Sequence, residues 1–411
     1  MVGYCLRGYM GQRLDQLLDR AGMLPGLLGH ARNVPLVQKA EGSRVYDVDN
    51  HGYIDYTGCD GTAMLGYANQ FVLDAARKTL GTGIPDGFHT AQEVELAEVL
   101  GQFVPWARAF TFHRSGDEAM DAALAAVVAL SGKERILFLR GGTAQGSSGC
   151  ATRERSPHGT RELEGWDGDR IEAAIVGGAS KVAAVVVDPL LTACGVIPPP
   201  DGLFRRIVDV CAEHGVLMVL DERVTGFRLA RDGAAGWAGI EPDIAVYGGA
   251  LGGGFPIGVV AFGEGVEPPA PVWPGSRGTV HPVVLAAAEA VLSVLKNDAV
   301  YERLEERTAQ LRDGLLALAE RFGRPMVINA VGSVFSIYLS REPVTGAASA
   351  VASDAEAYRR LAAGLREEGI LLPLEGLRPL FLSHAHSQKD VEETLTACER
   401  VLLRLHQEDL P

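Results

Sequence analysis

The sequence predicts an α/β fold, in which a large domain is built on a mainly parallel β-sheet covered by helices and a smaller α+β domain lies beside it. Short, almost uninterrupted apolar runs predict the sheet, because strands buried on both faces have no polar side to alternate with. Helical patterns lie between some of these runs, as parallel strands require. A chain of 411 residues also exceeds what one hydrophobic core usually serves, so we expect more than one domain.

The first part of the chain reads as mainly helical, with one hairpin. A polar helix is expected over residues 14–30. The segment VYDVDNHGYIDY then alternates as strands do, around a turn at Asn50–His51–Gly52. Further helical patterns follow at 70–80, 92–103 and 117–131.

The central part carries the apolar runs that predict the sheet, at 135–139, 182–188, 216–221 and 243–248, and a helix is expected at 202–214. Long helical patterns follow at 281–296 and 300–323, and later ones at 354–369 and 388–407. We therefore expect a large domain over 70–295 and a small domain made from both chain ends, 1–69 and 296–411.

Charge and cysteine usage narrow the possible partners. The formal net charge of −14 disfavours nucleic acid and anionic membranes, so a small-molecule substrate or another protein is expected. No apolar segment is long enough to span a bilayer, and the N-terminus does not read as a secretion signal. The six cysteines include no CxxC pair, which favours a reduced, cytoplasmic protein, and we predict no metal site.

Candidate ligand-binding residues follow the predicted strands, because ligands of open parallel sheets bind at the carboxyl ends of the strands. Ser115–Gly116 precedes a helix and is either an anion site or an ordinary helix cap. Asp221 ends an apolar strand and needs a partner, which is either a cationic cofactor ring or one of the nearby Arg223 and Arg228. The loop at 248–254 is rich in glycine, a weak signal on its own.

Taken in order, several segments resemble the class III, fold-type I aminotransferases that use pyridoxal phosphate (PLP), above all the glutamate-1-semialdehyde aminomutase branch. The resemblance implies a fold-type I aminotransferase-like large domain, a small domain from both termini, and a homodimer with active sites at the subunit interface. The segments that carry it are VYDVDNHGYIDYTG, QEVELAEVLGQFVP, FHRSGDEAM, VVVDPLLTACGVIPP, VLDERVTGFR, PDIAVYGGALGGGFPIG and GILLPLEGLRPLFLSHAHS.

The resemblance fails at the residue that carries the family's chemistry. Gly249 stands where the family has its Schiff-base lysine, and glycine has no amine with which to form an internal aldimine. Loss of that lysine removes both the nucleophile and the general base, so ordinary transamination should be severely impaired. None of the lysines in the chain follows a predicted strand; they are Lys39, Lys78, Lys133, Lys181, Lys296 and Lys389.

Three further departures fall on positions that the resemblance assigns to the cofactor. Thr143 and Ala144 stand where the family stacks an aromatic ring. Asp117 follows Ser115 and Gly116 in the phosphate cup, and its carboxylate repels a phosphate unless a cation such as Arg114 intervenes or pairs with it. Arg223 replaces the small apolar residue that packs on the pyridine ring.

Two more departures lie after the strand at 182–188. Asp188 replaces an expected glutamate, and Ala193 replaces an asparagine.

Other family features survive. Asp221 keeps the position beside the ring nitrogen, and Gly278–Thr279 matches the loop that reaches a phosphate across the dimer interface. Arg32 lies where the aminomutase branch binds a substrate carboxylate, although a surface arginine is the commoner case. His384 and His386 follow a small-domain strand, and structural packing is the expected role for both.

Three functional hypotheses follow. The first is a lysine-less transferase- or isomerase-like enzyme on a small amino- or keto-acid, with Asp221, Arg223 and Asp188 as catalytic groups and with PLP or pyridoxamine phosphate (PMP) bound non-covalently or not at all. The second is a non-catalytic paralogue that forms a heterodimer with an active relative. The third is an ordinary aminotransferase in which Gly249 was engineered. A repurposed pocket further predicts that Arg223 contacts either a ligand or the carboxylates of Asp221 and Asp188 in forked geometry.

Overall fold

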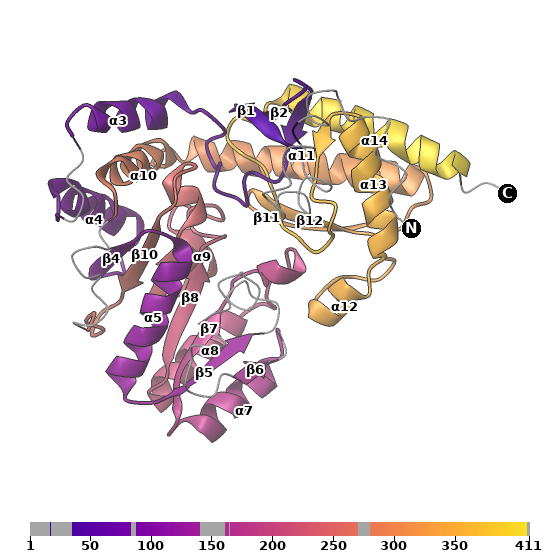
Figure 1. The fold of residues 1–411 in the computed structure, drawn as a ribbon. Helices are drawn as coiled ribbons and strands as arrows, with labels where there is room; N and C mark the ends of the chain where they lie inside the picture. Colours follow the sequence, from indigo (N-terminus) through magenta and orange to yellow (C-terminus); the bar gives the residue numbers. More distant parts are fainter. Residues whose placement is uncertain are drawn as a thin grey trace.

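The large sheet at the centre of the molecule has seven strands, in the order β4-β10-β9-β8-β7-β5-β6 (Figure 1). The structure is a computed structural model, and it describes Leu17 and residues 35–83, 88–139, 161–163, 165–269 and 280–408. The strands are β4 Ala109–His113, β5 Arg135–Leu139, β6 Arg161–Leu163, β7 Val182–Val187, β8 Leu217–Glu222, β9 Ile244–Tyr247 and β10 Gly258–Phe262.

The sheet is mainly parallel, as expected. The neighbours β6, β5, β7, β8 and β9 pair in parallel, whereas β10 runs antiparallel to both β9 and β4. β10 was not predicted from the sequence, although its apolar run GVVAF resembles those of its parallel neighbours.

Burial on both faces explains the apolar runs. All six residues of β7 are buried. Val185 and Val187 belong to the larger hydrophobic core, whereas Val186 faces the second core together with Ala123 and Val127 of α5 (Gly116–Ser131). Since each strand of this kind contributes to two cores, a polar residue within it would be buried on either face.

Helices cover the sheet on both sides. Figure 1 shows α5 running across one face of the sheet. Ser115 caps its start by accepting from the backbone N–H of Glu118 at 3.1 Å, and Gly132 ends it in the left-handed conformation. One helix of this part, α7 (Gly168–Gly178), was not predicted from the sequence. The other helices of this part are α3 Gln70–Leu80, α4 Ala91–Phe103, α8 Leu203–His214, α9 Gly233–Ala238 and α10 Pro282–Leu295.

A four-stranded sheet joins the two ends of the chain. The hairpin expected around residue 50 is present as β2 (Arg44–Asp47) and β3 (Gly52–Asp55), beside β1 (Val37–Glu41). β13 (Ile370–Leu371) pairs in parallel with β3. The expected helix at 14–30 lies outside the described residues, apart from Leu17, and the proposed domain boundaries remain a prediction.

The rest of the C-terminal part is a three-stranded sheet with helices packed around it. Figure 1 shows α11, α13 and α14 together at one end of the molecule. Within the described ranges, no helix combines the length and the apolar character needed to cross a membrane. The elements are α11 Ala299–Arg321, β11 Val327–Val331, β12 Val334–Tyr338, α12 Ala347–Val351, α13 Ala355–Glu367, β14 Leu380–Phe381 and α14 Gln388–Glu408.

Candidate functional site

Asp221 and Arg223 meet at the carboxyl end of β8. The side chain of Asp221 is fully buried, and that of Arg223 is 10% exposed. Nε of Arg223 donates to Oδ1 of Asp221 at 2.8 Å, and Nη2 donates to Oδ2 at 2.9 Å. Both oxygens of the buried carboxylate therefore have a charged donor, in the forked geometry that an arginine favours.

A third charged residue, Asp117, joins them from the first turn of α5. Nη1 of Arg223 lies 2.5 Å from Oδ1 of Asp117, whose side chain is 51% exposed. Arg114 is not the partner of Asp117, because it pairs with Glu118 at 2.6 Å. Arg223 thus links the end of β8 to the start of α5, and we call Asp117, Asp221 and Arg223 the Arg223 cluster.

The cluster keeps Arg223 charged. Burial opposes the charge, but the carboxylates of Asp221, Asp117 and Asp188 outweigh this effect and raise the pKa of the guanidinium above its usual range. Arg228, the other candidate partner of Asp221, lies elsewhere in the core.

Asp188 is held mainly by the turn that follows β7. Its carboxylate accepts from the backbone N–H groups of Leu190 at 3.1 Å and Thr192 at 3.0 Å, and from the hydroxyl of Thr192 at 2.5 Å. The forked contact of Arg223 is made with Asp221, and Asp188 acts on Arg223 through its charge.

Two glycines pack closely around Arg223. A Cβ atom added at Gly116 would lie 3.0 Å from Cδ of Arg223. Gly249, the first residue of a short 3₁₀ turn (Gly249–Gly252), has φ of +45°, and a Cβ there would lie 2.5 Å from the carbonyl oxygen of Arg223. That separation is shorter than real Cβ contacts. A lysine at position 249 therefore requires the turn to move.

The remaining predicted site residues divide into two groups. Arg32, Thr143, Ala144, Gly278 and Thr279 lie outside the described residues. Ser115 is placed, and its hydroxyl oxygen caps α5, which is the plainer of its two predicted roles. Across the described ranges, no group of His, Cys, Asp or Glu is arranged to hold a metal ion.

His386 packs in the core, where its ring lies 4.9 Å from that of Tyr56. Its Nδ1 accepts from the backbone N–H of Ser383 at 3.0 Å. Burial lowers the pKa of His386 to about 4, so the ring is neutral at physiological pH. His384 is partly exposed, and burial, together with Arg303, lowers its pKa as well.

Glu222, beside the cluster, holds the start of α9 in place, a role that was not predicted from the sequence. This fully buried carboxyl accepts from the backbone N–H groups of Ala234 at 2.8 Å and Ala235 at 3.1 Å, and from the hydroxyl of Thr225 at 3.0 Å. Burial outweighs these bonds and raises its pKa to about 7. The only signal in the sequence is a second acidic residue directly after Asp221.

Arg228 is another buried ionisable residue near the end of β8. Its side chain lies over the ring of Phe381, with Cζ 4.7 Å from the ring centroid. It donates to the carbonyl oxygens of Gly61 and Leu382 and to the hydroxyl of Ser333. Burial lowers its pKa to about 9. Its hydrogen bonds join the end of β8 to both terminal parts of the chain.

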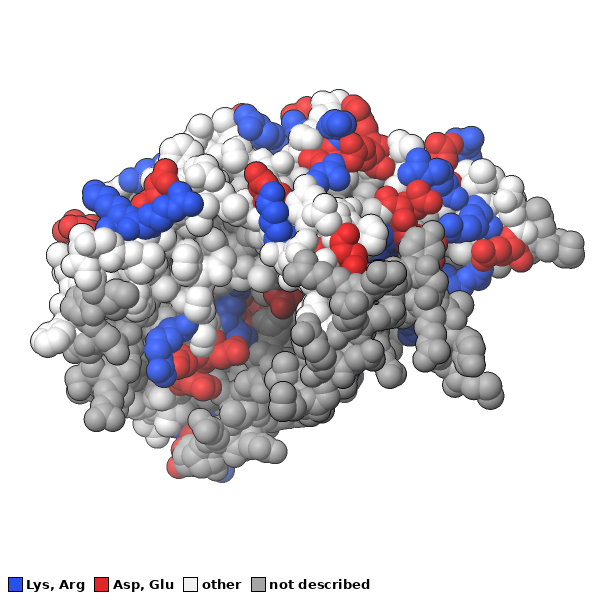
Figure 2. Space-filling view, turned by 45° about the horizontal axis from the view of Figure 1, so that its top comes forward, with Lys and Arg blue, Asp and Glu red and all other residues white. Residues whose placement is uncertain are grey.

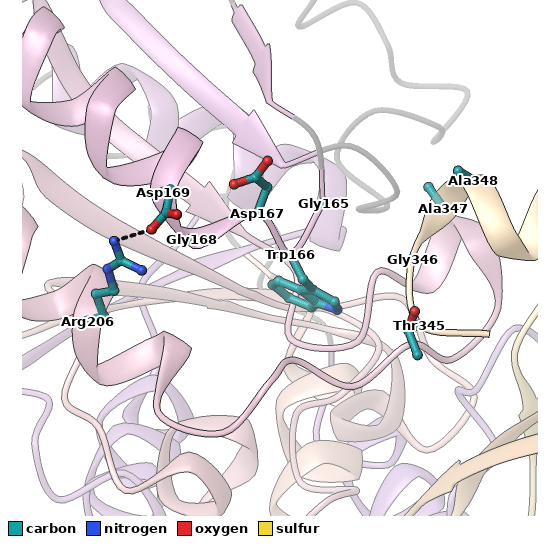
Figure 3. Close-up of a pocket in the computed structure, with 10 residues that line it drawn as sticks. All are labelled: Gly165, Trp166, Asp167, Gly168, Asp169, Arg206, Thr345, Gly346, Ala347 and Ala348. Atoms are coloured by element: carbon teal, nitrogen blue, oxygen red, sulfur yellow. Dashed lines mark hydrogen bonds and ion pairs between the residues drawn. The ribbon is translucent and has the colours of Figure 1, made fainter. Parts of the chain in front are cut away.

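A cavity of about 580 Å³ lies away from all of these predicted residues. Figure 3 shows Trp166 and Arg206 among its lining residues, with Arg206 paired to Asp169 at 2.7 Å. Thr345 and the start of α12 form the opposite side. Because Arg206 also pairs with Glu172, its charge is already balanced by carboxylates.

Surface charge on one face of the molecule is mixed. Figure 2 shows Lys and Arg interspersed with Asp and Glu over the described atoms of that face, and a hollow that holds both signs. The described part of this face shows no broad patch of one sign.

The mainly parallel seven-stranded sheet with its covering helices has the fold of the fold-type I aminotransferases. The family model for class III aminotransferases matches residues 29–142 and 166–401. The chain belongs to the class III aminotransferase family.

Sequence relatives agree with this assignment. The chain is 32% identical over 388 residues to a glutamate-1-semialdehyde 2,1-aminomutase of Brevibacillus brevis, covering 89% of this chain and 90% of the relative. It is 33% identical over 389 residues to a glutamate-1-semialdehyde 2,1-aminomutase of Sorangium cellulosum, covering 89% and 88% of the two chains.

Solved structures share the fold. An omega-transaminase from Sphaerobacter thermophilus superposes with a TM-score of 0.87 at 24% identity, covering 96% of this chain and 98% of its own. A glutamate-1-semialdehyde aminomutase from Pseudomonas aeruginosa gives a TM-score of 0.80 at 23% identity, covering 90% and 88%. These likenesses confirm the predicted fold class.

Members of this family normally bind PLP or PMP, and the described residues do not fit that cofactor in the pose that the resemblance implies. Gly249 offers no amine, and its turn leaves no room for a side chain. Arg223 already neutralises Asp221, the partner expected for the ring nitrogen. The described residues therefore offer neither the amine nor the free carboxylate through which the cofactor would act.

Proposed function

We propose that this protein is a divergent member of the class III aminotransferase family that makes no covalent link to PLP and uses a repurposed pocket for a small amino- or keto-acid-like molecule. The observation that carries the proposal is the turn at Gly249, where φ is +45° and a Cβ would lie 2.5 Å from the carbonyl oxygen of Arg223. A single lysine substitution does not fit this backbone, which argues against an engineered glycine in an ordinary enzyme.

Asp117, Asp221 and Arg223 are the polar groups of the proposed pocket. The half-exposed carboxylate of Asp117 is the member of the cluster that solvent reaches most readily. The contacts of Arg223 with described residues use three of the five N–H donors of its guanidinium, which leaves two for a ligand within the described part of the chain. Asp117 and these N–H groups are the proposed contacts for an amino- or keto-acid.

The covalent part of the proposal is tested by incubating purified protein with PLP, reducing with borohydride and measuring the mass. The expected result is the unmodified mass, while a lysine-bearing aminomutase treated in parallel gains one pyridoxyl group. An adduct on any lysine near the cluster overturns this part.

The ligand part is tested by thermal unfolding in the presence of a panel of amino acids and keto acids. At least one should raise the melting temperature of the wild-type protein, and the effect should weaken in Asp117→Asn, which keeps the shape of the side chain and removes its charge. If no member of the panel stabilises the protein, a pocket for this class of ligand is ruled out.

A second candidate function, a non-catalytic paralogue that forms a heterodimer with an active relative, is favoured by one observation. Both oxygens of Asp221 are paired within the chain, so the site needs no ligand to satisfy its buried charge. Mixing the protein with a lysine-bearing relative and measuring the masses of the intact complexes tests it. Only homodimers of each chain are expected if the first proposal holds.

A further inference from the structure

We infer that Asp117 and Arg223 replace, from within the chain, the two opposite charges that a zwitterionic cofactor otherwise brings to the end of β8 and the start of α5. The protein then needs no cofactor to balance the charges at this site, and substituting both residues should make the site accessible to PLP. This inference rests on the lysine-less pocket of the proposed function.

The cation of this internal pair is Arg223. A buried carboxylate such as Asp221 is costly unless a positive charge and hydrogen-bond donors accompany it. The guanidinium supplies both, through contacts of 2.8 and 2.9 Å. Its aliphatic part also fills the space beside Gly116 and Gly248, where added Cβ atoms would lie 3.0 Å from Cδ and 3.8 Å from Cγ of Arg223. Any other cation has to displace this side chain to reach Asp221.

The anion is Asp117. The first turn of a helix favours negative charge, because its backbone N–H groups are unpaired and the helix dipole is positive there. Asp117 lies in the first turn of α5 and is tied to Arg223 at 2.5 Å, so a carboxylate of the chain itself supplies this charge. A phosphate group arriving there meets a like charge instead of a free helix start.

The two halves depend on each other. Arg223 spans from Asp221 to Asp117, two residues that are more than a hundred positions apart in the chain. Removing Arg223 alone leaves two carboxylates close together, and removing Asp117 alone leaves the ring position filled. Only the double change to small, uncharged residues, Asp117→Thr with Arg223→Val, clears both ends.

The experiment measures the thermal unfolding of wild-type and doubly substituted protein with and without PLP, and PLP binding by absorbance titration. The melting temperature of the wild-type protein should not change with PLP. The double variant should melt several degrees lower without PLP, recover with it, and bind PLP at least ~10-fold more tightly than the wild type. Arg206→Val is the matched control, because Arg206 also bridges two carboxylates but lies on the surface, paired with Asp169 and Glu172.

Asp117→Thr alone keeps the buried Arg223–Asp221 pair and decides the matter if the double variant does not fold. It should bind PLP more tightly than the wild type and less tightly than the double variant. The inference is overturned if PLP stabilises the wild-type protein, or if Asp117→Thr and the double variant bind PLP no more tightly than the wild type. A borohydride-stable adduct counts against the proposed function instead, so the two failures are distinguishable.

Discussion

Arg223 donates to both carboxylate oxygens of Asp221, at 2.8 and 2.9 Å, at the end of β8 where the side chain of Asp221 has no access to solvent. Sequence neighbours two positions apart on a strand share a side of it, which brings the two side chains together once β8 ends. Arg223 thus neutralises the buried carboxylate at the end of β8, and the contribution of this pair to the free energy of unfolding can be measured.

Arg223→Val should lower the free energy of unfolding by about 3 kcal/mol, because it leaves a buried carboxylate without its partner. Asp221→Asn combined with Arg223→Val should recover at least half of that loss, since a neutral amide is cheaper to bury. Urea unfolding monitored by circular dichroism measures both. Arg206→Val, whose partners are exposed, should cost less than about 1 kcal/mol. Equal losses for the two arginines contradict the argument.

Gly249→Ala and Gly249→Lys should destabilise the protein to a similar extent, by about 1–3 kcal/mol, because the strain arises at Cβ and at a positive φ rather than from the lysine amine. Chemical unfolding of the two variants measures the effect. Gly249→Lys should also acquire no pyridoxyl group on borohydride reduction after exposure to PLP. A stable lysine variant that gains the adduct would show that the turn is an ordinary family loop lacking only its side chain.

Glu222 should make stability fall as the pH rises. Burial raises its pKa from 4.5 to about 7 in the folded state, so the folded protein holds a proton that the unfolded chain has released over that interval. This contribution is fully present below pH 4.5, is lost towards pH 7 and is constant above it. Urea unfolding across this range should show a shallower slope for Glu222→Gln. Glu264→Gln, at an exposed site, should keep the wild-type slope.

A homodimer is expected at micromolar concentration, as is typical of the family. Exposed large apolar side chains indicate which surface forms the interface between the two subunits. Phe71, Leu80, Phe88 and Val94, on or beside α3 and α4, are each more than half exposed in the single chain. Light scattering should therefore give twice the monomer mass for the wild type and a monomer for Phe71→Glu combined with Phe88→Glu. Val351→Glu, at an equally exposed site on α12, should remain dimeric. A monomeric wild type counts against the prediction.

The sheet was predictable because burial on two faces leaves a signature in the sequence. β5, β7, β8 and β9 lie within one residue of the apolar runs that predicted them. β10 was missed although all of its residues are buried, as those of its neighbours are. Strand direction leaves no signature in the sequence, so its antiparallel pairing with β9 could not be predicted. The glycines at both ends of α7 (GDRIEAAIVGG) weakened its helical pattern, which its packing against α8 overrides.

The site was predictable where its residues are close in sequence. Arg223 was expected to contact either a ligand or the carboxylates of Asp221 and Asp188 in forked geometry, and the structure shows the fork on Asp221. The contact with Asp117 was not expected, because it depends on how far the first turn of α5 reaches over the end of β8. The conformation of Gly249 was equally unreadable, since glycine is compatible with every backbone region.

The hydrogen bonds of Arg228 impose an order on biosynthesis. Gly61 leaves the ribosome before Arg228, but Ser333 and Leu382 follow it by more than a hundred residues. Until they arrive, the guanidinium has only the carbonyl oxygen of Gly61 among these three protein acceptors and needs water for the rest, so it cannot be fully buried. A ribosome that stalls after the large sheet has been synthesised is therefore expected to hold a nascent chain in which the Arg228 guanidinium is still hydrated. Arg228 gains its last protein acceptor when Leu382, the residue after β14, has been synthesised.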